Sequence, residues 1–537
     1  MLDSVGDEFT TRVASNRSGD ASGSIGARDV SKTSALSLAA PATLVLVLGA
    51  GAFLRFWKIN ELGYNSDEAV YSGQAASLAG DVDLSQFFPI FRAHPMVFQY
   101  LLSLVYSAFG VHDLVGRSLV ALVGLATIFL VYRAAADLYS EWTGVIAAAI
   151  LAFMPYHVVV TRQVLLDGPL TFCTTLTMLL LIRYAMTGKA AYLMGVGAAL
   201  GLTFLTKETG FVLATAAFAF LALTPKIQVR IWPLIGAGVC MMIPIFMFPV
   251  SIALAGRSDT ARSYLVWQLL RRSNHEWTFF PTVVPPAIGW LVLLTALAGL
   301  WALRSQRSWR ETLLISWIIV PTVVFQIWPV KGFQYLLPIA PAVAILAART
   351  LTHWHPPVLR RWLPAMPRIN VLNVVALILI LLSLALPSWQ ASNKQDATSR
   401  IAGAGGIPGV RETGEWIDEN LPEGAVVAAI GPSMANLVQY YGHRKAYGMS
   451  VSTNPLHRNP SYQPLSNPDA SLRYGEVHYL IWDSFSASRS PFFENTLMGY
   501  ARKFDATEIY SFAIPGPDNP DGTPGTQKII IIYEVGA

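Results

Sequence analysis

A pair of neighbouring carboxylates, Asp67 and Glu68, is a candidate for acid–base chemistry. Tyr71 follows them inside a helix predicted at 69–79. A carboxylate placed in this way can take the proton of an attacking hydroxyl group. The structural alternative is that Ser66 or Asp67 caps the helix, because the amino end of a helix favours acids. The motif therefore predicts a catalytic carboxylate, with or without a capping role.

A second acidic motif contains Asp167, between Arg162 and Pro169. Proline suits the first turn of a helix, so Asp167 is expected close to a helix start. Capping of that helix would explain the acid by itself. If Asp67 and Asp167 meet on one side of the protein, one can act as base and the other can orient the acceptor.

Two lysines stand beside apolar runs. Lys207 and Glu208 form a charged pair between two such runs, and Lys331 stands four residues before Tyr335. A solvated salt bridge in a hairpin would explain the first pair, and a snorkelling side chain would explain Lys331. The functional alternative is that both lysines hold an anion.

Loop 254–283 is rich in arginine and includes Arg271 and Arg272. Arginine side chains suit phosphate groups, although a solvated surface would also account for them. His94, which precedes Pro95, is a weaker candidate, because a lone histidine is more often an interface residue with satisfied hydrogen bonds.

The elements that must position these groups are apolar. Of the 537 residues, 53% are hydrophobic and only 13% are charged, and the mean hydropathy is +0.45. Soluble globular domains carry about 25% charged residues, and disordered chains combine low hydrophobicity with high charge. Both classes are excluded for most of the chain. A polytopic α-helical membrane protein is predicted instead.

About eleven apolar stretches have the roughly 20 residues that a membrane-crossing helix needs. The predicted crossings lie near 37–57, 114–134, 142–160, 168–187, 190–206, 210–225, 231–253, 284–303, 311–329, 333–350 and 370–388. The apolar stretch 96–110 is shorter and carries Gln99 and Tyr100, so we expect a helix that lies along the membrane interface.

The distribution of lysine and arginine gives the expected orientation, because these residues favour cytoplasmic loops. With the amino terminus inside, the basic loops face the cytoplasm, and both acidic motifs lie outside with residues 389–537. That segment has 11 Lys and Arg against 15 Asp and Glu, a net charge of −4, which leaves +9 for residues 1–388. We expect a disordered cytoplasmic tail at 1–36, a transmembrane domain at 37–388 and an extracytoplasmic domain at 389–537. The absence of a cleavable signal pattern fits a multi-pass protein of a bacterial plasma membrane.

Residues 389–537 contain charges, proline and glycine, and no predicted crossing. Helices are expected at 410–421, 432–441 and 491–503, and strands at 425–430, 477–482 and 528–533. This alternation predicts a small α/β domain, and nothing in it matches a nucleotide-binding glycine fingerprint. Cys173 and Cys240 lie in apolar runs, which excludes a disulfide framework. The basic residues do not follow one face, so no nucleic-acid partner is expected.

The candidate groups together suggest one chemistry. Carboxylates that can deprotonate a hydroxyl group and cations that can hold a phosphate are expected at one membrane surface. A lipid tail can lie in the bilayer there while its head group projects outside. The combination predicts sugar transfer from a lipid-phosphate donor, with charge on the departing phosphate stabilised by Lys and Arg.

The motifs also match a known pattern. The matched residues, in order, are Asp67-Glu68 with Tyr71, His94-Pro95, Phe109-Gly110 with Arg117, Leu166-Asp167-Gly168-Pro169, Leu205-Thr206-Lys207-Glu208, and Lys331 with Tyr335-Leu336-Leu337-Pro338. In this order they resemble the C-type integral-membrane glycosyltransferases that use polyprenyl-phosphate sugars. The resemblance is greatest with the branch containing the aminoarabinose transferases of lipid A and the protein O-mannosyltransferases, and it covers roughly residues 40–350.

The resemblance implies an inverting transfer of a hexose or pentose to a glycan, lipid or protein acceptor. It implies that Asp67 is the base, that Glu68 supports it, and that Asp167 orients the acceptor or shares a divalent metal. Lys207 and Lys331 would face the donor phosphate, whereas arginine joins them on the charge argument alone. The candidate set is Asp67, Glu68 and Asp167 for catalysis, Lys207, Arg271, Arg272, Lys331 and Tyr335 for the donor phosphate, and Tyr71, His94, Arg162 and Glu208 as further pocket residues.

Two other function classes remain open. A transporter or flippase would place buried charges near the middle of the membrane and would often show internal repeats. An assembly protein would use its outside domain to bind envelope polymers. Metal dependence is also open, because a few oxygen ligands without fixed spacing give a weak metal signal.

Overall fold

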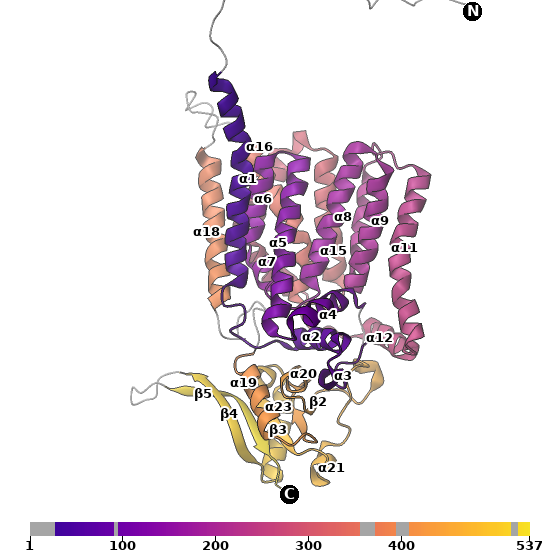
Figure 1. Ribbon diagram of the computed structural model, residues 1–537, viewed down its shortest axis with the longest axis vertical. Coiled ribbons are helices and arrows are strands. Elements are labelled where there is room, and N and C mark those ends of the chain that lie inside the picture. The colour runs from indigo at the N-terminus through magenta and orange to yellow at the C-terminus, as the bar shows by residue number, and fades with distance from the viewer. Residues whose placement is uncertain (1–26, 91–94, 355–370, 394–406, 517–524, 537) are drawn as a thin grey trace, which may run out of the picture.

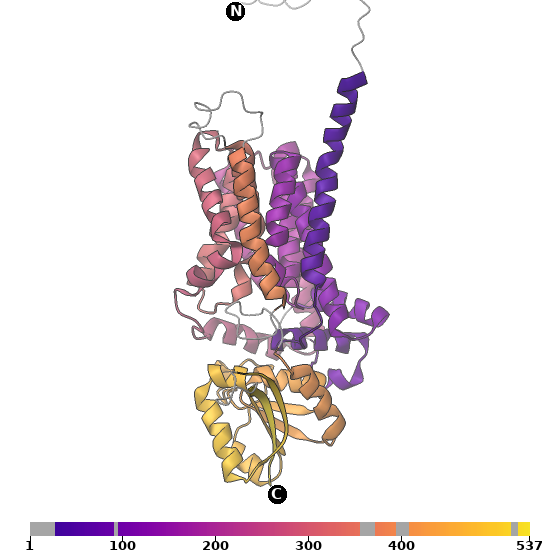
Figure 2. The ribbon, with the colours of Figure 1, turned by 90° about the vertical axis from the view of Figure 1, so that its left-hand side faces the viewer.

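The computed structural model describes residues 27–90, 95–354, 371–393, 407–516 and 525–536, with side chains from residue 39 onward. A bundle of upright helices carries a layer of short crossing helices at one end, and a small α/β domain lies beyond that layer (Figure 1; Figure 2). Helix α1 (Ala27–Phe56) begins at the opposite end of the bundle and runs toward the α/β domain. It starts ten residues before the predicted crossing at 37–57, and residues 1–26 of the predicted tail lie outside the described ranges.

The bundle places apolar side chains both inside and on its outer surface. Its helices after α1 are α5 (Asp113–Leu138), α6 (Glu141–Phe153), α7 (Pro155–Val160), α8 (Asp167–Thr187), α9 (Ala190–Thr206), α10 (Phe211–Leu223), α11 (Ile231–Leu254), α13 (Phe279–Ile288), α14 (Trp290–Ala302), α15 (Trp309–Ile327), the 3-10 helix η3 (Phe333–Ile339), α16 (Ala340–His353) and α18 (Val371–Asn393). Exposed side chains on α11 include Trp232, Phe246 and Leu254. Apolar residues on all sides of a helix are expected where lipid replaces water.

Within the described ranges, seven helices are long and apolar enough to cross a membrane, and the bent pair α13–α14 makes eight at most. The predicted crossings near 142–160, 190–206 and 210–225 fall on shorter apolar helices of 10–17 residues. The prediction of a multi-pass helical membrane protein is therefore confirmed. The number of eleven crossings stays a prediction.

Two predicted crossings are not single straight helices. The stretch 142–160 is divided at Pro155, which begins α7 after α6 has ended, because proline lacks an N–H group and disfavours helical geometry in the residue before it. The stretch 284–303 bends by 91° between α13 and α14. Gly289 lies at this bend with a φ of 99°, a backbone conformation that glycine adopts without strain.

A layer of short helices lies between the bundle and the α/β domain (Figure 1). It consists of α2 (Ser66–Ala79), α3 (Val82–Ser85), α4 (Val97–Phe109) and α12 (Ser258–Leu270). Helix α4 packs on α2 and is two-sided: Leu102 and Tyr106 are buried, whereas Leu101, Leu104 and Phe109 are exposed. A helix is thus present where one was expected, at 96–110, and its exposed apolar side would suit the membrane surface, although its place along the interface stays a prediction.

The α/β domain contains one five-stranded sheet in the order β2-β1-β3-β5-β4. The strands are β1 (Val426–Ala429), β2 (Lys445–Gly448), β3 (Tyr479–Asp483), β4 (Thr507–Pro515) and β5 (Thr526–Glu534). The helices are α19 (Val410–Asn420), α20 (Pro432–Tyr441), α21 (Pro468–Arg473), α22 (Ser484–Arg489) and α23 (Pro491–Lys503). Strand β1 is parallel to β2 and β3, whereas β5 is antiparallel to β3 and β4. Helix α20 is the crossover that parallel pairing of β1 with β2 requires.

Specific polar contacts fasten the α/β domain to the membrane part. Asp113, at the start of α5, accepts hydrogen bonds from the Arg411 guanidinium at 2.6 Å and from the Tyr441 hydroxyl. The Tyr441 oxygen in turn accepts a hydrogen bond from the backbone N–H of Tyr64 at 2.7 Å. The domain is therefore fixed against the loop that precedes α2.

Asp483, at the end of β3, makes the α/β domain sensitive to pH. Its Oδ1 accepts the backbone N–H of Ser486 at 2.7 Å, while its Oδ2 is buried without a partner among the described residues. Burial raises the pKa of Asp483 from 3.8 to about 6. The folded domain therefore keeps a proton that the unfolded chain loses, so this stabilisation is complete below pH 3.8 and disappears as the pH rises through 6.

We expect the Asp483→Asn variant to remove this pH dependence. The lost stability amounts to about 3 kcal/mol, at about 1.4 kcal/mol per pKa unit. Asparagine keeps an acceptor for Ser486 but does not titrate. In thermal unfolding experiments, the purified wild type should therefore become less stable than the variant as the pH rises from 4 to 6. Parallel pH curves for the two proteins would contradict the assignment.

Candidate functional site

At the start of α2, the helix is capped by a residue other than Asp67. Asn65 is the N-cap, and its side-chain oxygen accepts the backbone N–H groups of Asp67 and Glu68, both at 3.0 Å. Glu68 completes a capping box by accepting the N–H of Asn65. The expectation that Ser66 or Asp67 caps this helix is therefore wrong. The carboxylate of Asp67 is exposed and is not the cap.

Glu68 is fully buried and holds an arginine. Its two oxygens accept the Arg117 guanidinium at 2.9 and 2.8 Å. Arg117 also donates to the carbonyls of Ile59, Leu62 and Gly63, so all five of its N–H donors are in use. Glu68 is thereby a positioning residue, since it fixes the loop on which Asp67 stands.

The same network joins the two acidic motifs. Glu68 accepts the backbone N–H of Val164 at 3.0 Å, and Asn65 donates to the side chain of Gln163 at 2.8 Å. Helix α8 begins three residues later, at Asp167. The start of α2 is consequently held against the start of α8, which brings Asp67 and Asp167 to the same end of the bundle.

Asp167 and Lys207 form a buried ion pair. The ammonium group donates to the two carboxylate oxygens at 2.8 and 3.0 Å, and both side chains are almost completely buried. The ammonium also lies 4.5 Å from the centre of the Tyr335 ring. Burial has the largest single effect and lowers the pKa of Lys207, but Asp167, Tyr335 and Glu208 together outweigh it, and the pKa rises to about 12. Lys207 therefore stays charged at neutral pH.

Tyr71 links the exposed acid to this pair. Burial raises the pKa of the Tyr71 phenol well above its usual value, and the charges of Asp67 and Asp167 raise it further. The carboxylate of Glu208 and the phenol of Tyr264, on α12, contribute in the same direction. Both acids thus lie close enough to act on one phenol, which remains a neutral hydrogen-bond donor.

Arg271 of loop 254–283 borders this cluster, which consists of Asp67, Tyr71, Asp167, Lys207, Glu208, Tyr264 and Tyr335. Burial raises the pKa of Tyr264, and the carboxylate of Glu208 raises it further, whereas Arg271 acts in the opposite direction. Arg271 also lies 4.4 Å from the ring centre of Trp267. The backbone of Lys331 is paired with the Asn274 side chain at 2.8 and 2.9 Å, and Lys331 is buried.

Among the described contacts, none joins Arg162, Arg272 or the side chain of Lys331 to the cluster. Arg272 is exposed. Arg162 donates to the backbone carbonyls of Leu54 and Arg55, at 2.6 and 3.0 Å, and so closes the end of α1. His94 lies outside the described residues.

Sequence reasoning missed the residues that support the site. Arg117 was matched as part of a motif but was given no role, although an arginine in the first turn of the predicted crossing at 114–134 needs a partner if it is buried. Tyr264 carried no signal in a loop rich in arginine. Asn436, on α20 of the α/β domain, donates to the Ser66 hydroxyl at 3.0 Å, a contact that no local pattern could predict.

The described residues contain no group of three His, Cys, Asp or Glu side chains suited to a metal. Asp67 is the exposed carboxylate of the cluster, whereas Asp167 is already neutralised by Lys207. The sharing of a divalent metal by Asp167 stays a prediction.

Residues 93–252 match the family of dolichyl-phosphate-mannose-protein mannosyltransferases. The undecaprenyl phosphate-alpha-4-amino-4-deoxy-L-arabinose arabinosyl transferase of Serratia proteamaculans (strain 568) is 29% identical over 189 residues, which are 31% of this chain and 33% of that protein. A putative mannosyltransferase of Bacillus subtilis (strain 168) is 27% identical over 236 residues, which are 42% of this chain and 33% of that protein. The matches thus span a third of the length of these relatives.

The whole chain is similar in fold to a solved protein. ArnT from Cupriavidus metallidurans in the apo state superposes with a TM-score of 0.64 at 14% identity, over 94% of this chain and 98% of that one. The same protein bound to undecaprenyl phosphate gives a TM-score of 0.59 at 15% identity, over 93% and 98% of the two chains. At this identity the likeness concerns the fold.

Proposed function

Since the chain belongs to the superfamily of C-type integral-membrane glycosyltransferases, we propose that it transfers a sugar from a polyprenyl-phosphate donor to an acceptor hydroxyl group. One observation carries the proposal: exposed Asp67 shares an electrostatic environment with the buried pair of Asp167 and Lys207. A base and a cation for a phosphate therefore lie within one cluster. The bound undecaprenyl phosphate in the ArnT structure supports a lipid phosphate as the carrier.

In the proposed reaction, Asp67 takes the proton of the acceptor hydroxyl as its oxygen attacks the anomeric carbon. The bond between that carbon and the phosphate oxygen breaks, and its electron pair leaves with the polyprenyl phosphate. Attack from the side opposite the leaving group inverts the configuration at the anomeric carbon. The neutral phenol of Tyr71 would donate a hydrogen bond and so orient the substrate groups that lie between Asp67 and Asp167.

The charge that develops on the phosphate needs a cation. Lys207 is held by Asp167 in a fixed orientation and keeps its charge, so it is the first candidate for the phosphate. Arg271, which borders the cluster, and Lys331 would act at longer range. The acceptor would be a glycan, lipid or protein of the envelope, and the sugar a hexose or a pentose. The site and the α/β domain would face the outside of the plasma membrane.

A turnover assay of the purified protein tests the proposal. It would use a panel of polyprenyl-phosphate hexoses and pentoses with envelope extracts as acceptors, each with and without a chelator. We expect release of polyprenyl phosphate and one glycosylated product of inverted configuration. Absence of turnover with every donor, while the protein remains folded, would exclude this function.

Removal of Lys207 should weaken donor binding. Lys207→Met alone would leave Asp167 buried without a partner, so the informative variant is the double substitution Asp167→Asn with Lys207→Met. We expect it to bind polyprenyl phosphate about 10- to 100-fold more weakly, because a charge-assisted hydrogen bond is lost. Fluorescence titration with a labelled polyprenyl phosphate measures this effect.

The single variant Asp167→Asn is the comparison. It keeps the side chain of Lys207, and the negative charge of a bound phosphate would replace the carboxylate that holds Lys207 in its charged form. Once the variant is shown to be folded, it should therefore keep the affinity for polyprenyl phosphate within about threefold. It should instead raise the KM of the acceptor, if Asp167 orients that substrate. Equal donor affinity in the single and the double variant would contradict a role of Lys207 at the phosphate.

A further inference from the structure

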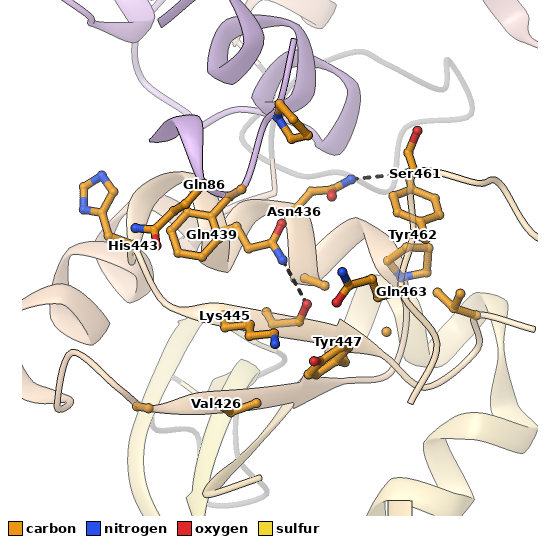
Figure 3. Close-up of a pocket in the computed structure, with 18 of the residues that line it drawn as sticks. Gln86, Val426, Asn436, Gln439, His443, Lys445, Tyr447, Ser461, Tyr462 and Gln463 are labelled. Carbon is orange, nitrogen blue, oxygen red and sulfur yellow. Dashed lines mark hydrogen bonds between the residues drawn. The ribbon is translucent and has the colours of Figure 1, made fainter. Parts of the chain in front are cut away.

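A groove of about 530 Å³ lies between the membrane part and the α/β domain (Figure 3). One wall is formed by the segment after α3, with Gln86 and Phe87. The other wall is formed by α20, β2 and the loop that contains Gln463. Its volume is in the usual range for ligand sites, about 300 to 1,000 Å³. The groove exists only because the two parts of the chain are fastened together.

The lining includes four amide side chains and three aromatic side chains. Gln86, Gln439 and Gln463 surround a common space, and Tyr447 lies beside it (Figure 3). An amide both donates and accepts hydrogen bonds, as a sugar hydroxyl group does. An aromatic ring offers an apolar face against which the C–H groups of a sugar ring can pack. The lining therefore suits a hydroxyl-rich ligand.

The charge of the groove argues against a phosphate or another anion. Apart from two tyrosines, its titratable lining side chains are one carboxylate, one imidazole and one ammonium group, those of Glu423, His443 and Lys445. The negative charge of Glu423 and the positive charge of Lys445 offset each other, so the groove does not strongly favour anions or cations. The groove therefore differs from the Lys207 cluster and fits a neutral ligand.

The groove adjoins the candidate base. Asn436, one of the lining residues, donates to the Ser66 hydroxyl at 3.0 Å and to the Tyr462 hydroxyl at 3.4 Å. Ser66 immediately precedes Asp67. A ligand in the groove is thus separated from the loop of the base by a single side chain.

The edge of the sheet gives a reason to prefer a glycan to a peptide. Strand β2 is an edge strand, and such edges can bind a peptide as an added strand. The carbonyl of Ala446 on this strand, however, already accepts the side-chain amide of Gln439 at 2.9 Å. That contact occupies a backbone group that an added strand would need.

We propose that this groove binds a neutral oligosaccharide segment of the acceptor, next to the hydroxyl group that reacts at Asp67. That the bound oligosaccharide belongs to the acceptor rests on the proposed function of the Asp67 cluster. That the ligand is a neutral oligosaccharide rests on the lining of the groove alone. It names the acceptor as a glycan, or as a lipid or protein that already carries one.

The test measures binding of fluorescent pentasaccharides of glucose, mannose, galactose and arabinose to the full-length protein in detergent. Gln86→Ala and Gln463→Ala each remove one exposed amide, one from each wall. Gln527→Ala, at the exposed start of β5, is the matched control. We expect at least one pentasaccharide to bind, and each groove variant to weaken it about 10-fold. The same variants should raise the KM of the acceptor and leave kcat and the donor KM unchanged.

The possible outcomes separate the two proposals. Binding that neither groove variant weakens, binding by no pentasaccharide, or displacement by an unglycosylated peptide would overturn the groove assignment. Groove-dependent oligosaccharide binding without turnover of any donor would support the groove and would count against sugar transfer. Turnover with unchanged acceptor KM in both variants would support sugar transfer and overturn the groove.

Discussion

The Asp67→Asn variant is expected to lose about 100- to 10,000-fold in kcat, the range over which general bases contribute. Asparagine has the shape of the carboxylate but cannot accept the acceptor proton at neutral pH. The fold at the start of α2 should survive, because Asn65 and not Asp67 caps that helix. Donor binding should survive as well, since Lys207 stays paired with Asp167. Steady-state kinetics and a donor titration on the same preparation measure both properties.

Asp83 provides the matched control for this substitution. It lies in α3, after α2, and it is exposed. Asp83→Asn removes one negative charge from the same side of the protein, so it reproduces any general electrostatic effect. We expect its kcat to stay within about twofold of the wild type, since a distant surface charge acts weakly in water. Full turnover of Asp67→Asn, or an equal loss in Asp83→Asn, would refute the assignment of the base.

The Glu68→Gln variant is expected to destabilise the protein by about 3–5 kcal/mol, as is usual when one partner of a buried ion pair is removed. Arg117 would remain charged and buried without its carboxylate. Glu68 also ties Val164 to the start of α2, so both acidic motifs should loosen together. Thermal unfolding measures the total loss. Hydrogen exchange should rise at 59–68 and at 161–167 at the same time.

Glu61→Gln is the matched control, because Glu61 forms an exposed ion pair with Lys58 in the same loop. Exposed pairs contribute about 0–1 kcal/mol, so this variant should unfold nearly as the wild type does. If Glu68→Gln were equally mild, or if exchange rose only at 59–68, Glu68 would not hold the two motifs together.

Elements with strong local signals could be predicted from the sequence. Helices at 432–441 and 491–503 have the predicted bounds, because a proline begins each of them and apolar spacing continues to its end. Strand β2 was missed, since Lys445–Gly448 has only four residues and no alternation. Strand β4 was missed because most of its side chains are only partly buried, so it carries little apolar signal.

The residue types of the candidate site could be proposed from the sequence, but the sequence did not indicate which of the two neighbouring acids is exposed and which is buried. Asp67 and Glu68 are adjacent and alike in sequence, yet one is exposed and the other is fully buried. The difference depends on Arg117, which lies 49 residues further along the chain. Burial of this kind results from tertiary packing, and no local pattern carries it.

Helix α4 has a consequence for the kind of donor that the protein can use. Its exposed apolar side would anchor in the lipid surface, and α2 with Asp67 is packed on its other side. The height of the carboxylate above the hydrocarbon is therefore constant. A polyprenyl tail with more isoprene units would extend deeper among the acyl chains without shifting the scissile bond. Donors that differ only in tail length should thus react with similar kcat and differ mainly in their partitioning into the bilayer.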